Sequence, residues 1–207
     1  MRQVFFLIIF LFSLSTGAFA QLQLTDQINP ELLNKKWSAK WITCPNISGT
    51  EFGVYLFRKT FTVASAPKQF IVHVSADNRY KLYVNEKQVA TGPASGDLLN
   101  WHFESIDIAP LLQEGKNTIA AVVWNFANYR PLAQVSGQTG FILQGNSATE
   151  NAVKTDAAWR VTKDLAYAPI NNKPRDVGPG EKFTCQANPW GGRKLISTIR
   201  LGARLRN

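Results

Sequence analysis

The stretch Phe-Ile-Val-His-Val-Ser-Ala-Asp at residues 70–77, followed by Arg-Tyr-Lys-Leu-Tyr-Val at residues 79–84, decides the fold class of this 207-residue chain. In the first run every second residue is apolar and the residues between are mixed. The second run repeats the alternation at Tyr80, Leu82 and Val84. Alternation of this kind is typical of β-strands that bury one face, so the two runs predict neighbouring strands of a sheet.

Further β-rich runs lie on both sides of this stretch. They cover residues 54–63, 102–108, 117–124 and 140–144, with a short one around Trp159. The breaks between runs fall at residues 85–86, 92–93, 95–97 and 114–117, which are rich in Asn, Gly, Pro and Asp and so favour turns. Many short strands at this spacing are typical of an all-β domain.

Helix signals are weak outside the first 20 residues. Short helices are expected only near residues 30–36 and 109–113, and no longer stretch has a sustained apolar period of 3.6 residues. This pattern excludes α/β nucleotide-binding folds. We predict an all-β fold, an antiparallel β-sandwich of jelly-roll type.

The net charge of +9 comes largely from the two ends of the chain. Six of the 23 basic residues lie in residues 1–20 or 191–207, which contain no acid, so residues 21–190 carry 17 bases against 14 acids. A nearly neutral middle, in a chain with 45% hydrophobic residues overall, predicts a packed core and no nucleic-acid partner.

The first 20 residues have the pattern of a secretory signal peptide. Arg2 precedes an apolar run over residues 4–12, and Ala18-Phe19-Ala20 forms a small-x-small cleavage site before Gln21. The apolar run is shorter than the roughly 20 residues that a membrane span needs. We therefore expect export to the periplasm or the exterior, without a membrane span.

The two cysteines leave two possibilities open. Export would permit a disulfide between Cys44 and Cys185, and two separate thiols are the alternative. Sequence alone does not bring the two positions together.

The sequence contains none of the common signatures of catalysis. A dinucleotide fingerprint, a phosphate loop, a His-Glu-x-x-His zinc motif and a Gly-x-Ser-x-Gly elbow are all missing. His73 and His102 are the only histidines, and each lies in a strand pattern that favours a packing or surface role. We assign no catalytic residue, and whether the chain is an enzyme stays open.

Aromatic and amide residues near strand ends carry a stronger hypothesis. Trp101, Asn125, Tyr129 and Arg130 have the side chains that stack on a sugar and hydrogen-bond its hydroxyls, and we predict that they bind carbohydrate. The alternative is that Tyr129 and Arg130 only hold their loop. Trp124 closes an alternating apolar row and is expected in the core.

A structural Ca²⁺ ion is the one cofactor considered. Carbohydrate-binding jelly rolls often hold one, and Asp77, Asn78 and Asp97 are oxygen donors in suitable loops. The alternative is that these residues only form turns.

Five motifs, in one order, resemble bacterial α-L-rhamnosidases, a glycoside hydrolase family. They are Trp-Ser-Ala-Lys-Trp-Ile at 37–42, Tyr-Leu-Phe-Arg-Lys-Thr-Phe at 55–61, Ser-Ala-Asp-Asn-Arg-Tyr-Lys-Leu-Tyr-Val-Asn at 75–85, Gly-Pro at 92–93 with Gly-Asp at 96–97, and Ile-Ala-Ala-Val-Val-Trp at 119–124. The resemblance runs from about Trp37 to Trp190 and concerns the amino-terminal region of these enzymes. Related modules precede other exo-glycosidases, including β-galactosidase-like enzymes.

The resemblance implies a galactose-binding-domain-like sandwich over residues 37–190, after a linker at 21–36. It also implies a rhamnose-containing glycan as partner and a separate catalytic (α/α)₆ barrel, which no residue of this chain matches. We therefore expect a carbohydrate-recognition or scaffold module without its catalytic domain. The alternatives are a stand-alone carbohydrate-binding protein and the β-domain of another exo-glycosidase.

Two segments depart from the family pattern. Glu86 stands where the family favours glycine, and because a non-glycine residue at positive φ costs about 1 kcal/mol, we expect a different turn. Residues 191–207 form a basic tail unlike the expected continuation, for which a frameshift and a genuine polyanion-binding tail are the two hypotheses.

Overall fold

The computed structural model describes residues 28–170 and 180–187. Within these ranges the chain forms an antiparallel β-sandwich, and the predicted fold class is confirmed. The expected signal peptide and the basic tail lie outside the described residues. No helix in this part of the chain is long and apolar enough to cross a membrane.

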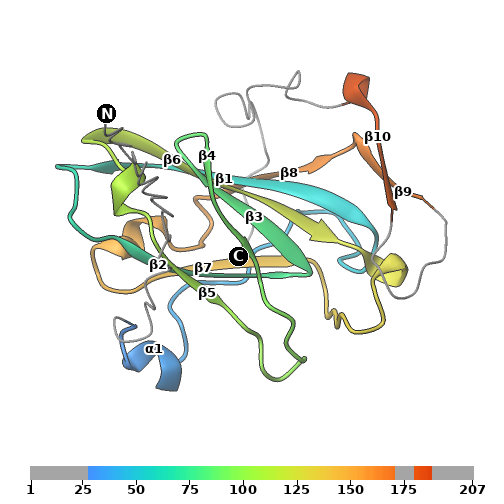
Figure 1. The fold of residues 1–207 in the computed structure, drawn as a ribbon, viewed down its shortest axis with the longest axis horizontal. Helices are drawn as coiled ribbons and strands as arrows, with labels where there is room; N and C mark the ends of the chain where they lie inside the picture. The colour runs from blue at the N-terminus through green and yellow to red at the C-terminus, as the bar shows by residue number, and fades with distance from the viewer. Residues whose placement is uncertain (1–27, 171–179, 188–207) are drawn as a thin grey trace, which may run out of the picture.

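Two sheets pack face to face (Figure 1). The larger has the order β4-β3-β6-β1-β8 and the smaller the order β5-β2-β7. Their strands are β1 (Gly53–Val63), β2 (Ile71–Asp77), β3 (Arg79–Val84), β4 (Lys87–Gly92), β5 (Glu104–Asp107), β6 (Gly115–Asn125), β7 (Gly140–Gly145) and β8 (Arg160–Asp164). A separate hairpin is formed by β9 (Tyr167–Ile170) and β10 (Gly180–Phe183).

The main core lies between the two sheets and uses the inward rows of the strands. Phe70, Val72, Val74 and Ala76 of the quoted stretch are at most 1% exposed, and Tyr80, Leu82 and Val84 of β3 face them. The period-2 alternation therefore assigned these inward faces correctly. Phe57, Tyr80 and Trp159 all pack around the ring of Phe141.

The other face of β2 is polar but also buried. The His73 ring nitrogens lie 2.9 Å from Ser105 Oγ and 3.1 Å from Asn146 Oδ1, and its ring packs against Trp37 and Phe103. Ser75 Oγ donates a hydrogen bond to the His102 carbonyl. His73 thus has the packing role that the strand pattern favoured, whereas the side chain of His102 is exposed and only its backbone carbonyl takes part in this bond.

Short helical turns connect the strands. Helix α1 (Glu31–Asn34) and the 3₁₀ turn η2 (Ala109–Leu111) lie where short helices were expected, and η3 (Ala127–Tyr129), η4 (Glu150–Val153) and η5 (Cys185–Ala187) are additional. Asn29, before α1, donates its backbone N–H to Asn146 Oδ1. Asn29 therefore ties the segment before α1 to the sandwich.

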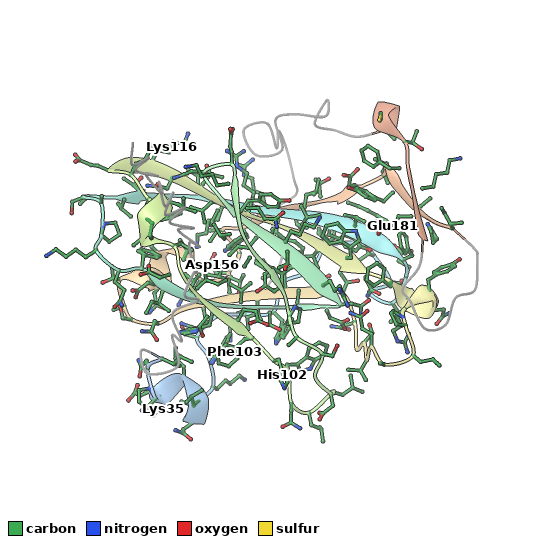
Figure 2. The ribbon with its side chains drawn as sticks, in the orientation of Figure 1. Lys35, His102, Phe103, Lys116, Asp156 and Glu181 are labelled. Atoms are coloured by element: carbon green, nitrogen blue, oxygen red, sulfur yellow. The ribbon has the colours of Figure 1, made fainter. Side chains whose placement is uncertain are left out.

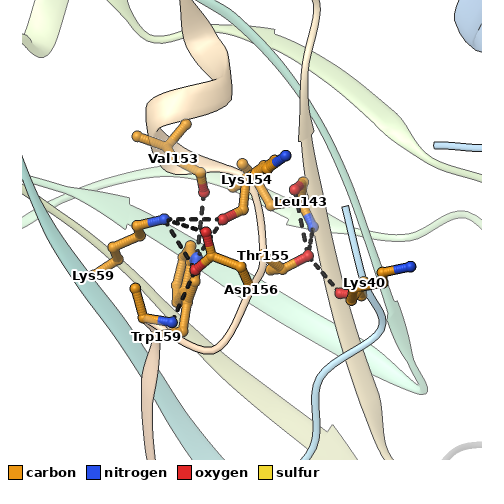
Figure 3. A network of polar contacts seen from close by, with 9 residues as sticks. Lys40, Lys59, Leu143, Val153, Lys154, Thr155, Asp156 and Trp159 are labelled. Carbon is orange, nitrogen blue, oxygen red and sulfur yellow. Dashed lines mark hydrogen bonds and ion pairs between the residues drawn. The ribbon is translucent and has the colours of Figure 1, made fainter. Parts of the chain in front are cut away.

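A polar network anchors the segment after η4 to the sandwich (Figure 3). Lys59 Nζ of β1 lies 3.1 Å from the carboxylate of Asp156, and the Thr155 hydroxyl donates to the Lys40 carbonyl. The Trp159 indole N–H lies 3.0 Å from the Lys154 carbonyl. Trp159 is thereby held inside the core while its polar atom is satisfied.

The hairpin between β3 and β4 corrects one expectation. Asn85 and Glu86 both have positive φ, 46° and 72°, as a two-residue type I′ turn requires. The type I′ turn that the family forms with glycine is therefore kept here without glycine. The expectation of a different turn was wrong. Asn85 supports it, because its amide donates to the Leu111 carbonyl and to Asn117 Oδ1.

Three strands were not predicted from the sequence. β4 follows the turn at Asn85 and pairs with β3, whereas β9 and β10 are only four residues long each. Tyr167 of β9 packs edge-on against Trp124 and against Phe183 of β10. The β9–β10 hairpin thus lies on the outer face of the five-stranded sheet.

Candidate functional site

A groove of about 840 Å³ lies at one end of the five-stranded sheet. Strands β3, β4, β6 and β10 and the loops at residues 93–95 and 126–134 contribute to its lining. The side chains that matter below are Tyr80, Trp124, Phe126, Gln134 and Glu181.

Trp124 forms an aromatic wall of the groove because it points away from the main core. Ile119, Ala121 and Val123 of β6 face inward, so the alternate row that ends at Trp124 faces outward and packs on a second cluster with Val54 and Leu56. Trp124, which was expected in the core, is partly buried against this second cluster and does not lie in the main core between the sheets. β6 carries apolar residues on both faces, so the alternation of apolar and polar residues does not indicate which face points toward the main core.

Charged groups surround the Trp124 ring. Lys81 Nζ lies 5.5 Å from the ring centroid, and the Trp124 indole is near enough to the Glu181 carboxyl to favour its charged form. Figure 2 labels Glu181 where β10 approaches the sheet. Burial raises the pKa of the Glu181 carboxyl, against the opposing effects of Trp124 and Lys81.

Three buried oxygen atoms that line the groove have no hydrogen-bond partner. They are Tyr80 Oη, Gln134 Oε1 and Glu181 Oε1. Tyr80 is 1% exposed, and Gly92 permits its approach, because a Cβ there would lie 3.0 Å from the Tyr80 ring and 2.9 Å from Glu104 Cγ. Since buried polar groups are normally paired, this set is a reason to consider a polar ligand.

The groove thus combines aromatic surface with buried hydrogen-bonding atoms and with both signs of charge. Burial, followed by the negative charge of Glu104, raises the pKa of the Tyr80 hydroxyl, so it stays a neutral donor at physiological pH. Hydroxyl groups of a ligand can both donate to Gln134 Oε1 and accept from Tyr80. Sequence reasoning missed Tyr80, Gln134 and Glu181, because they come from three distant segments.

The predicted ligand residue Trp101 lies in a second, smaller hollow of about 280 Å³, here called the Trp pocket. Its ring packs edge-on against Trp41 with 5.7 Å between centroids, and Leu98, Thr43 and Asp77 also line the pocket. Thr43 Oγ1 is buried there without a partner.

The other three predicted ligand residues do not converge with Trp101. Asn125 is fully buried, and its amide donates to the Gly49 carbonyl and to Thr139 Oγ1. Arg130 donates to the carbonyls of Gln134 and Ala127, so it holds its own loop, as the alternative reading expected. Tyr129 is 37% exposed and packs edge-on against Phe52.

The three predicted calcium ligands already accept hydrogen bonds. Asp77 Oδ2 accepts from the Gly137 N–H and Asn78 Oδ1 from the Phe126 N–H, while Asp97 accepts from Leu99 and Asn100 in its own exposed turn. A calcium ion would compete with these donors, and the calcium site stays a prediction. Among residues 28–170 and 180–187, no cluster of three or more His, Cys, Asp and Glu side chains is placed to hold a metal.

The two cysteines are separate thiols. Cys44 is buried and Cys185 is exposed, and neither forms a disulfide. Burial raises the pKa of the Cys44 thiol, which makes it less reactive.

The fold is similar to part of solved α-L-rhamnosidases. The GH78 family rhamnosidase of Bacillus sp. GL1 matches with a TM-score of 0.68 and 27% sequence identity, over 77% of this chain and 17% of that enzyme. The α-L-rhamnosidase from Dictyoglomus thermophilum matches with a TM-score of 0.55 and 18% identity, over 77% of this chain and 20% of the enzyme. At that lower identity the likeness concerns the fold alone.

This chain therefore spans a fifth or less of the length of these two enzymes. No protein family model and no curated protein matches it. The structural likeness confirms the resemblance that the sequence motifs predicted: over 77% of its residues, this chain is similar to a domain-sized part of α-L-rhamnosidases.

Proposed function

We propose that the chain is a non-catalytic carbohydrate-recognition module of an exported α-L-rhamnosidase-like system, and that its ligand is a rhamnose-containing glycan bound in the groove. The observation that carries the proposal is the set of three unpartnered oxygens in residues that line the groove together with Trp124. A sugar offers an apolar ring face for the tryptophan and hydroxyls for the oxygens. The likeness to the Bacillus rhamnosidase supports rhamnose as the first sugar to test.

The Trp pocket is the competing location for the same ligand. It contains two tryptophans and one unpartnered hydroxyl, but its volume is a third of that of the groove. The groove is favoured because it combines more unpartnered acceptors with a larger aromatic and apolar lining.

Titration calorimetry with L-rhamnose and with rhamnose-containing oligosaccharides tests the proposal. We expect binding in the millimolar range that Trp124→Ala abolishes and Gln134→Ala weakens, whereas Trp101→Ala and Tyr129→Ala leave it unchanged. Loss of binding in Trp101→Ala alone would transfer the ligand to the Trp pocket and overturn the groove assignment. Absence of binding to every sugar would reject carbohydrate recognition.

The non-catalytic part of the proposal needs its own assay. Glu181, with its raised pKa, and Glu104 share the groove, and a pair of carboxylates is what glycosidases use. We expect no turnover of an aryl α-L-rhamnoside above the protein-free control. Turnover that Glu181→Gln removes would make the groove an active site.

A further inference from the structure

Two arginines face each other on the outer side of the five-stranded sheet. Arg58 of β1 is paired with Arg160 of β8 in the antiparallel register. Directly opposite residues in such a pair have Cβ atoms about 5 Å apart, and like charges in this arrangement destabilise the sheet. The presence of two like charges at directly opposite positions therefore needs an explanation.

The pair lies on the same face of the sheet as the groove. Trp124 is paired with Val54, and Arg58 follows four residues later on β1 without a bulge. Alternation places residues an even number apart on one face, and four residues of strand span about 13 Å. The arginine pair and the Trp124 ring therefore lie on one face of the sheet, with the buried side chains of Val54 and Leu56 between them.

Arg58 also contains an unpaired buried donor. Its Nε atom is buried and has no hydrogen-bond partner, and burial followed by the charge of Arg160 lowers the pKa of its guanidinium. In the part of the chain that the structure describes, the ion pairs use Lys35, Lys59 and Lys163, and neither arginine takes part. A buried N–H donor without an acceptor is costly.

A carboxylate matches the needs of this pair. The guanidinium carries five donors in a planar fork that fits two carboxylate oxygens, and one negative charge between the arginines would offset their repulsion. We propose that Arg58 and Arg160 bind the carboxylate of an acidic sugar, so that the ligand of this face contains a uronic acid. The choice of a sugar as the source of the carboxylate rests on the proposed function, because the groove shares the face.

Binding of D-galacturonate and D-galactose to the whole chain tests the proposal, because the two sugars differ in the carboxylate. At low ionic strength we expect galacturonate to bind at least about tenfold more tightly than galactose, and added salt to weaken it. Arg160→Gln should remove this preference, and Arg58→Lys should reduce it, because lysine lacks the fork.

Lys116→Gln is the matched control. Lys116 is exposed at the far end of the five-stranded sheet from Glu181 (Figure 2), so its loss changes net charge without touching the pair. Equal loss of galacturonate binding in Lys116→Gln and Arg160→Gln would overturn the proposal, as would equal affinity for the two sugars. Thermal melts of each variant check folding, and Arg160, which is exposed, tolerates substitution.

Two further arms separate this inference from the proposed function. Trp124→Ala should abolish rhamnose binding and leave the preference for galacturonate, so failure of the groove does not remove the arginine site. Acetate should bind more weakly than galacturonate. If acetate binds equally well, the sugar as the source of the carboxylate is overturned.

Discussion

The buried face of β2 and the groove beside Trp124 both place polar atoms inside the protein, with opposite results for hydrogen bonding. His73, Ser75 and Asp77 each have partners from neighbouring segments. Tyr80 and Gln134 each leave an oxygen unpaired, although they are equally part of the fold. Partnered polar atoms on β2 hold loops in place, whereas the unpaired oxygens are buried in residues that line an opening, and they lack a partner within the described chain.

The largest effect is expected where a partnered residue is removed. Asn125→Ala should lower the free energy of unfolding by about 2–4 kcal/mol, because the buried Ala127 N–H loses its partner and the Gly49 carbonyl and Thr139 Oγ1 each lose one of theirs. Urea denaturation measures the change, with Asn128→Ala as the exposed control in the same loop. A stable Asn125→Ala protein that had lost only sugar binding would restore Asn125 as a ligand residue.

A substitution in the groove should have the opposite effect: it should weaken sugar binding without lowering the stability of the protein. Tyr80→Phe removes a hydroxyl that has no partner, so the free energy of unfolding should stay the same or rise by up to about 1 kcal/mol. Sugar affinity should fall about tenfold, which corresponds to the loss of about 1.4 kcal/mol of binding free energy. Calorimetry and denaturation together check this, and clear destabilisation would mean that the hydroxyl has a structural partner after all.

The β3–β4 turn offers a smaller change at a site outside both regions. Glu86 has a φ of 72°, and Glu86→Gly should stabilise the protein by about 1 kcal/mol because glycine adopts this conformation without strain. Glu86→Ala is the control and should give no gain. A melting temperature raised equally by both substitutions would point to the lost charge instead of the backbone.

The smallest effect concerns pH and the partnered face of β2. Burial lowers the pKa of His73, so the unfolded chain binds a proton at pH values where the folded protein does not. Stability from this group is present above the ordinary pKa of about 6.5 and is lost as the pH falls through the lowered value. His73→Gln should flatten the loss of stability between pH 7 and pH 5, and exposed His102→Gln should not; identical profiles for the two variants would contradict the assignment.

The sequence alone predicts well which residues face inward in strands where apolar and polar residues alternate. The rows at 70–76 and 80–84 alternate between apolar and polar residues, so their inward faces were assigned correctly. β6 carries apolar residues on both sides, and the period of two therefore gave no preference for the face of Trp124. β9 and β10 are too short for a pattern, and each includes a residue, Pro169 and Gly180, that weakens strand propensity.

The candidate site was less predictable because it depends on pairing between distant segments. Tyr80, Gln134 and Glu181 come from β3, from the loop after η3 and from β10. None of them belongs to a motif, and only the folded chain shows that their oxygens lack partners. Arg58 and Arg160 are likewise ordinary strand residues until the β1–β8 register is known.

That register also bears on how the chain reaches its native state. Val54 pairs with Asp164, so more than a hundred residues must be closed into a loop before β8 can join β1. Contacts of such long sequence separation slow folding, and during synthesis the edge of β1 stays unpaired on this side until residue 164 has been made. Until then that edge is open to pairing with other chains, and co-expression with a chaperone should raise the soluble yield.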